Sequence, residues 1–293
     1  MSRRATFLIL ASLSTTSVLA QEADTTSPRI ESFSLESRVF ENRREIRVAL
    51  PPSYDSAEHR ETRYPVFYLN DGFAVFKSTL WDAPATARRL MREGKIPEII
   101  LVGIDNGATA TGGSPKQRSL EYLPFADTVY EPSASNPLGY RYPNFLLEEV
   151  MPAVAARYRV KAGAEHTALG GASLGGLAAL YAVMQHPGIF GGVMLESTPT
   201  FMADSRILQE AHLIESWPAR VYLGIGTKET ENVELNRGAI PRCRDLAMVI
   251  TRMSPSTRVD VFVGEGDAHN AKAWSRRFPH ALQFLFGSPI ADK

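Results

Sequence analysis

The feature that most constrains the fold is a glycine–serine pentapeptide between an apolar run and a stretch of small apolar residues. Ser173 has glycine two residues before it, at Gly171, and two residues after it, at Gly175. The apolar run Thr167–Leu169 predicts a strand, and the residues from Leu174 onward predict a helix. A sharp strand-to-helix turn at a serine leaves no room for side chains at the two flanking positions. The sequence therefore predicts a nucleophile elbow at Ser173.

Apolar runs and amphipathic stretches alternate through the rest of the chain. The predicted strands are Glu45–Leu50, Tyr64–Leu69, Ile99–Ile104, His166–Leu169, Val193–Leu195, Val221–Ile225 and Val259–Val263. The predicted helices are Ala83–Glu93, Tyr142–Tyr158, Leu174–Gln185, Pro241–Met253 and Ala271–Phe286. Several strands are almost entirely apolar, which is typical of a parallel sheet covered on both faces. We therefore expect a single α/β domain over residues 33–288, with a mostly parallel sheet, helices on both faces and an antiparallel edge made by the early strands.

The N-terminal residues have the composition of a targeting segment. Arg3 and Arg4 precede the apolar run Ala5–Leu13, and the small residues of Ser17–Ala20 offer a cleavage site. This pattern predicts a secretory signal peptide over residues 1–20, followed by a flexible leader over residues 21–32. No later stretch approaches the roughly 20 apolar residues of a spanning helix, so we expect no membrane span. The predicted location is secreted or periplasmic.

The charge and the motifs of the chain limit the classes of partner and cofactor that we expect. The 32 basic and 32 acidic residues give a formal net charge of zero, without runs of like charge, so a nucleic-acid partner is not expected. The sequence shows no phosphate-binding glycine motif and no His/Cys cluster with metal spacing, so we expect neither a metal nor another cofactor. The single cysteine, Cys243, cannot form an intramolecular disulfide, and we expect it to be a buried helix residue.

A serine nucleophile needs a base, and His269 has the suitable position. It lies in the glycine-rich stretch after the predicted strand Val259–Val263, at the carboxyl edge of the sheet. Elbow hydrolases carry serine, acid and histidine in that chain order, which favours a histidine near the C-terminus. The other histidines are less suitable. His59 and His166 precede Ser173, and His186 ends the helix that follows Ser173. His212 lies in a polar stretch, and His280 lies on the final predicted helix.

The acid is expected to follow a strand between the serine and the histidine. The strand Val221–Ile225 runs into Gly226-Thr227-Lys228-Glu229, which brings Glu229 to the same edge. A carboxylate at this place would orient the histidine and hold the tautomer that accepts the serine proton. Glu231 and Asp245 remain alternatives.

The oxyanion of an acyl-transfer intermediate needs two N–H donors. The elbow supplies the backbone amide of Leu174, at the start of the predicted helix. The predicted strand Tyr64–Leu69 runs into Asn70-Asp71-Gly72, and this turn offers the backbone amide of Phe73 as the second donor.

Taken in order, these motifs resemble the enterochelin esterase and esterase D family. The resemblance spans about Glu45 to Phe286 and includes Asp71-Gly72, Gly94-Lys95-Ile96-Pro97, Val102-Gly103-Ile104-Asp105, Arg118 with Glu121-Tyr122, the elbow, Gly226-Thr227-Lys228-Glu229 and His269. It implies an α/β-hydrolase fold and carboxylic ester hydrolysis, and it supports the roles of Glu229 and the Phe73 amide. It also implies that Arg118 and Glu121 line the cleft, with a structural ion pair as the alternative. Siderophore esterases of the family carry a Ser-Phe-Trp-Trp stretch where this chain has Ser197-Thr198-Pro199-Thr200-Phe201.

The function predicted from these residues is carboxylic ester hydrolysis by a Ser-His-Glu triad through an acyl-enzyme. The substrate would be a small-molecule ester, such as a siderophore trilactone or a related ester. Two alternatives remain: acyl transfer to an alcohol or sugar by the same triad, and a catalytically idle α/β-hydrolase domain that binds a ligand.

Overall fold

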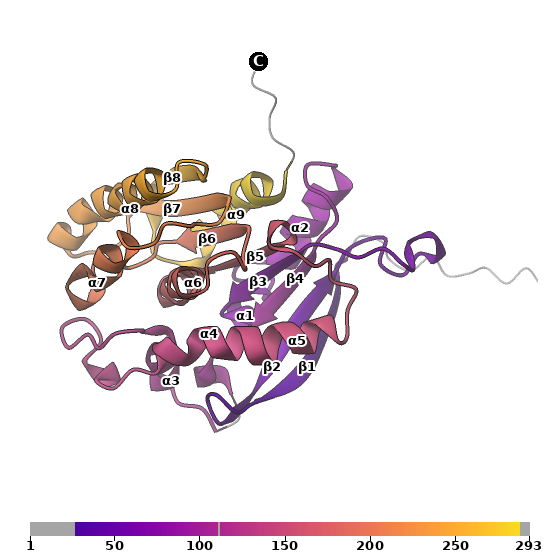
Figure 1. Cartoon of the computed structure of the whole chain (residues 1–293), viewed down its shortest axis with the longest axis horizontal. Helices are drawn as coiled ribbons and strands as arrows, with labels where there is room; N and C mark the ends of the chain where they lie inside the picture. The colour runs from indigo at the N-terminus through magenta and orange to yellow at the C-terminus, as the bar shows by residue number, and fades with distance from the viewer. Residues whose placement is uncertain (1–26, 111, 288–293) are drawn as a thin grey trace, which may run out of the picture.

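The computed structural model describes residues 27–110 and 112–287, and within them the strands form one eight-stranded sheet (Figure 1). The six strands from β3 to β8 run parallel, whereas β1 and β2 form an antiparallel edge next to β4. This is the predicted α/β-hydrolase architecture. In spatial order the strands are β1 (Arg29–Ser37), β2 (Asn42–Leu50), β4 (Ile100–Ile104), β3 (Val66–Asn70), β5 (Thr167–Ala172), β6 (Gly192–Glu196), β7 (Arg220–Lys228) and β8 (Arg258–Ala268).

The N-terminal boundary of the domain lies earlier than expected. Strand β1 begins at Arg29 and pairs antiparallel with β2, so that Arg29 lies opposite Leu50. Residues 29–32, predicted to belong to the leader, are therefore part of the sheet. Polar residues on the exposed side of this edge strand interrupt the apolar pattern from which a strand is predicted. The predicted signal peptide lies outside the described residues.

Alternate residues of the central strands pack into two separate cores. In β3, Phe67 and Leu69 face the core made with α2 (Ala83–Arg92) and α9 (Ala271–Phe286). Val66 and Tyr68 face the opposite core. The helices on that side are α4 (Tyr142–Asn144), a π-helical segment (Phe145–Val150), α5 (Met151–Ala155), α6 (Leu174–Gln185) and α8 (Val233–Met253). Helices therefore cover both faces of the sheet, as Figure 1 shows.

Two elements near the functional edge extend beyond their predicted limits. Helix α8 begins at Val233 and not at Pro241, because the side chain of Asn232 accepts the Leu235 amide at 3.0 Å and caps an earlier start. Strand β8 continues through Ala268, which pairs with Lys228, where the glycine content predicted a loop. Three helices had no predicted counterpart: α1 (Gly72–Val75), α3 (Lys116–Tyr122) and α7 (Met202–Ala211).

A further prediction concerns membrane-spanning helices. No helix in residues 27–110 and 112–287 is long and apolar enough to cross a bilayer.

The single cysteine was predicted to be a buried helix residue. Cys243 lies half-buried on α8, and burial raises the pKa of its thiol to about 12. The thiol is therefore neutral near pH 7 and is a poor nucleophile.

Candidate active site

Ser173 lies on a strained turn between a central strand and a helix. Strand β5 ends at Ala172 and α6 starts at Leu174, and Ser173 between them has φ 56° and ψ −130°. A Cβ atom at Gly171 would lie 2.6 Å from the backbone of Gly175. Gly171 is therefore required by the close approach of the elbow to itself, whereas a Cβ atom at Gly175 would lie 2.9 Å from the Asp71 carboxylate. The Ser173 amide donates to the Glu196 carbonyl at 2.8 Å, which fixes the turn to β6.

The structure brings His269 and Glu229 together. Glu229 directly follows β7 and His269 directly follows β8, and these two strands are neighbours in the sheet. Nδ1 of His269 and Oε2 of Glu229 are 2.8 Å apart. Both alternative acids, Glu231 and Asp245, are exposed. Glu229 is therefore the carboxylate that contacts His269 in this structure.

Three hydrogen bonds stabilise the charged form of Glu229. The Ser197 hydroxyl donates to its Oε1 at 2.7 Å, and the Gly226 amide donates to the same oxygen at 2.5 Å. Burial raises the pKa of the Glu229 carboxyl, but the hydrogen bonds from His269, Ser197 and Gly226 outweigh burial and lower that pKa below its usual value. Glu229 is consequently ionised over the range in which a histidine can act as a base.

A cavity of about 440 Å³ joins these residues. Ser173, Leu174, Glu229 and His269 all line it. The apolar and aromatic lining residues include Tyr130, Phe201, Met202, Ile225 and Leu235, and Arg242 also lines the cavity. The cavity therefore places Ser173, His269 and Glu229 beside apolar and aromatic side chains.

Arg118 also lines the cavity, and it is held by Asp71. Its Nε and Nη2 atoms donate to the two Asp71 oxygens at 2.8 and 2.7 Å. The Asn106 side chain donates to Asp71 at 2.6 Å and completes the cluster. Phe73 follows two residues later in α1, and its amide hydrogen-bonds the carboxyl of Asp105. The predicted second oxyanion donor is thus near the elbow but already has an acceptor.

Glu121 lies elsewhere, in a buried ion pair. Arg44 donates to both of its oxygens at 2.8 Å, and the Gly107 amide donates to Oε2 at 2.9 Å. The Glu121 residue is 3% exposed, and it is not among the residues that line the cavity. Of the two positions suggested by resemblance for the cleft, only Arg118 faces it. Glu121 has the structural role that was the alternative, since it ties α3 to β2.

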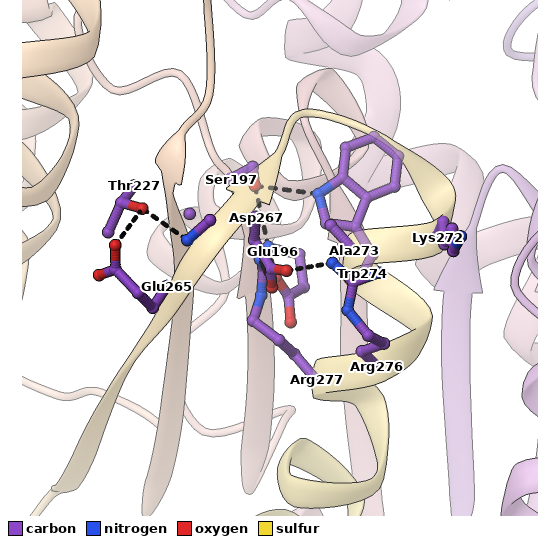
Figure 2. A network of polar contacts seen from close by, with 12 residues as sticks. Glu196, Ser197, Thr227, Glu265, Asp267, Lys272, Ala273, Trp274, Arg276 and Arg277 are labelled. Carbon is purple, nitrogen blue, oxygen red and sulfur yellow. Dashed lines mark hydrogen bonds and ion pairs between the residues drawn. The ribbon is translucent and has the colours of Figure 1, made fainter.

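The sequence did not reveal a polar cluster behind Glu229. Ser197, which directly follows β6, receives the Trp274 indole N–H at 2.9 Å and an Arg277 N–H at 3.2 Å. Figure 2 shows this arrangement, with Arg277 between Glu196 and Asp267. Trp274 lies on the predicted helix Ala271–Phe286, for which no polar role was expected from the sequence. The rule that located Glu229, a polar residue just past the carboxyl end of a central strand, also applies to Ser197 and could have found it.

The described residues, 27–110 and 112–287, contain no group of three or more His, Cys, Asp or Glu side chains that could hold a metal ion.

Comparisons with known proteins give the family. Residues 37–285 match the family described as "Putative esterase". The chain belongs to this esterase family. It is accordingly a carboxylic ester hydrolase. A curated relative, the uncharacterized protein YbbA of Bacillus subtilis (strain 168), is 23% identical over 258 residues, which are 87% of this chain and 96% of YbbA.

Solved structures share the fold of this esterase. The siderophore hydrolase EstA of Aspergillus nidulans is 22% identical, with a TM-score of 0.70 over 87% of this chain and 93% of EstA. A ferulic acid esterase is 18% identical, with a TM-score of 0.68 over 89% of this chain and 98% of its own. At this level of identity the likeness concerns the fold, which agrees with the parallel sheet and the elbow described above.

Proposed function

We propose that the esterase hydrolyses its substrate with a Ser173–His269–Glu229 triad. The observation that carries the proposal is the 2.8 Å contact between His269 Nδ1 and Glu229 Oε2 in the cavity that Ser173 also lines. Because Glu229 is ionised, Nδ1 carries the proton and Nε2 of His269 has the free lone pair. Nε2 is then the atom that accepts the proton of the Ser173 hydroxyl.

The reaction follows from these positions. Ser173 Oγ attacks the ester carbonyl carbon while its proton passes to His269 Nε2. The tetrahedral intermediate breaks the carbon–oxygen bond of the ester, and His269 returns the proton to the leaving alcohol. Water then attacks the acyl-enzyme with His269 as base again, and the acid is released. Glu229 stays ionised throughout and stabilises the imidazolium that forms twice per turnover.

The oxyanion is stabilised by backbone amides. The Leu174 amide is at the first position of α6, where helix N–H groups have no acceptor within the helix and the helix dipole favours negative charge. The Phe73 amide is the proposed second donor. Because it hydrogen-bonds Asp105 in the resting structure, its contribution requires that this bond be shared with the oxyanion.

We propose a siderophore trilactone or a related ester as the substrate. The structural neighbours include one named a siderophore hydrolase and one named a ferulic acid esterase. The rings of Tyr130 and Phe201 meet edge to face on the cavity wall, 4.8 Å apart, and such a wall suits an aromatic group. We further propose that the enzyme acts outside the cytoplasm, on the strength of its N-terminal sequence; fractionation of cells expressing the full chain tests this.

The experiment that tests the triad is the intact mass of the protein after exposure to a fluorophosphonate. Labelling requires an activated serine but not a correct guess at the substrate. We expect one adduct per wild-type chain and none on Ser173→Ala. A folded wild type that stays unlabelled would count against the triad and favour a binding role. Hydrolysis of trilactone, feruloyl and short acyl esters, with and without an acceptor alcohol, then ranks the substrates and detects any acyl transfer.

A further inference from the structure

The hydroxyl of Ser197 has three polar neighbours that together fix its proton. Trp274 Nε1 lies 2.9 Å from Ser197 Oγ, Arg277 Nη2 lies 3.2 Å from it, and Glu229 Oε1 lies 2.7 Å from it. Indole and guanidinium groups only donate hydrogen bonds. They therefore occupy the two lone pairs of the hydroxyl oxygen, and the only direction left for the hydroxyl proton is toward Glu229.

The same donor count applies to Glu229. Its Oε1 receives the Ser197 hydroxyl and the Gly226 amide, and its Oε2 faces His269 Nδ1. With two donors on Oε1, the carboxylate is held in one rotamer with Oε2 directed at the imidazole. This favours the His269 tautomer with the proton on Nδ1, which leaves Nε2 free to act as the base.

We propose that Ser197 and Trp274 are positioning residues, which act through Glu229 to fix the proton arrangement of His269. The proposal rests on the triad proposed above and extends it to residues that do not touch the substrate. Trp274 also contacts His269 directly. The two rings meet edge to face, with their centroids 5.1 Å apart and an angle of 84° between their planes. One side chain therefore both restrains the imidazole and orients the hydroxyl that supports its carboxylate partner.

Backbone geometry supports this reading of Ser197. Its φ is 47°, in the left-handed region that non-glycine residues seldom adopt, and its amide donates to the Gly224 carbonyl at 2.8 Å. Glycine would adopt this conformation at lower cost. A serine here is strained for its backbone, and its hydroxyl has the three contacts that offset the strain.

Other ionisable groups surround the cluster and bear on any pH measurement. Arg277 pairs with Glu196 at 2.7 Å and with Asp267 at 2.8 Å, and Asp267 also contacts Arg276. Burial raises the pKa of Glu196 to about 7, although Arg277 opposes the shift. Activity alone could therefore report on Glu196 as well as on His269. A direct readout of the imidazole is needed.

The test follows the NMR titration of the His269 imidazole, assigned with His269→Gln, in the full chain. In Ser197→Ala the Glu229 carboxylate loses a donor, so it accepts more strongly from the imidazolium. We expect the His269 titration to move upward by about half a pH unit. The acid limb of the kcat/KM profile should move the same way, with kcat about tenfold lower and KM little changed. Ser197→Gly, which relieves the φ strain but also lacks the hydroxyl, should behave like Ser197→Ala.

A matched pair of tryptophans provides the control. Trp274→Phe removes the indole donor and should shift the His269 titration upward by less than Ser197→Ala. Trp81 packs against Trp274 with ring centroids 5.9 Å apart, but within the described chain its Nε1 has no hydrogen-bond partner. Trp81→Phe should therefore leave the titration at its wild-type position.

The outcomes separate this proposal from the triad itself. If Ser197→Ala titrates His269 as the wild type does, or if Ser197→Gly restores the wild-type titration, the hydroxyl has no positioning role. If both serine variants fail to fold, equal titrations in Trp274→Phe and Trp81→Phe overturn the proposal. Fluorophosphonate labelling of the wild type tests the triad independently. An unlabelled wild type counts against the triad, whereas a labelled wild type with an unshifted Ser197→Ala refutes only the positioning role.

Discussion

The two sides of the cavity are built by different means. On the side of His269, polar atoms from β6, β7, β8 and α9 hold one another through directional hydrogen bonds, among them Glu229 to Ser197 at 2.7 Å. On the side of Tyr130 and Phe201 the cavity wall is aromatic, and the two rings meet edge to face. A single carboxylate holds that wall together. Asp127 accepts the amide of Tyr130 at 2.7 Å and that of Ala203, from the segment after Phe201, also at 2.7 Å.

Because the two sides are built differently, we expect their substitutions to change different kinetic constants. A directional network fixes protons and bond angles, so its loss should mainly lower kcat. An apolar wall provides contact area and shape, so its displacement should mainly raise KM. Substitutions on each side therefore test whether the two sides act separately.

The largest effects are expected at the reacting atoms. Ser173→Ala and His269→Ala should each lower kcat by about 10⁴-fold or more, because each removes the acyl-enzyme route. The double variant should be no worse than either single one, because the two residues act as a unit. Steady-state kinetics on an activated ester checks this, with circular dichroism to verify folding. Substantial turnover by His269→Ala would remove the histidine from the mechanism.

Glu229→Gln should lower kcat by about 10³-fold, somewhat less than the loss of the serine, because the neutral amide no longer stabilises the imidazolium. The matched control is Glu231→Gln, two residues along the chain and exposed, which should retain wild-type kinetics. Equal losses in the two variants would contradict the pairing seen here and reopen the choice of acid.

Asp127→Asn should raise KM by about tenfold while kcat changes little, since the wall moves and the triad does not. It should also destabilise the fold by about 2 kcal/mol at neutral pH, because three backbone amides lose a charged acceptor. The control is Asp204→Asn, at an exposed carboxylate on the same segment. A fall in kcat with unchanged KM would show that the wall also orients the reacting atoms.

The stability effect of Asp127→Asn should depend on pH. Burial raises the pKa of Asp127, but the amides of Tyr130, Ala203 and Val129 outweigh burial and lower it below its usual value. A carboxyl whose pKa is lower in the folded state contributes stability above its unfolded pKa, and the contribution is lost as the pH falls through the folded value. The difference between wild type and variant in urea unfolding should thus be constant above about pH 5 and should shrink below about pH 4. A difference that grows on acidification would contradict this.

The smallest effect is expected at Arg242, a cation on the apolar wall. Its guanidinium lies 5.1 Å from the Phe201 ring and donates to the Leu235 carbonyl at 2.7 Å. Arg242→Gln should raise KM by about threefold, in keeping with an exposed cation–π contact. The control is Arg237→Gln, which should leave KM unchanged. Arg237 is exposed on the same helix and pairs with Glu234. A large fall in kcat for Arg242→Gln would mean that the two sides are coupled.

Much of the fold could be predicted because its signals are local. The limits of α6 and α9 match the predictions, since α6 is a continuous run of small and apolar residues and α9 carries an apolar stripe. The start of α8 was missed because its first two turns are largely exposed and carry no apolar stripe. Strand β1 was missed for a similar reason, as an edge strand with polar residues on its open side.

The candidate site was predictable where the strand-end rule applied. Ser173, Glu229 and His269 each follow a parallel strand, and the carboxyl ends of such strands lie at one edge of the sheet. The rule did not separate Arg118 from Glu121. These residues are three apart on one helix, and only packing decides that Arg118 meets the cavity while Glu121 meets Arg44.

The elbow and the class of chemistry follow from local sequence, because glycine spacing and strand-to-helix order are properties of neighbouring residues. The carboxylate that meets His269, and the groups that hold this carboxylate, are defined only by the packed structure. Ser197 and Trp274 are 77 residues apart in the chain. The Trp274 indole donates to the Ser197 hydroxyl, which in turn donates to Glu229. Hydrogen bonds of this kind are directional and short. They exist only once β6, β7 and β8 lie side by side and α9 packs against them, which no local pattern in the sequence specifies.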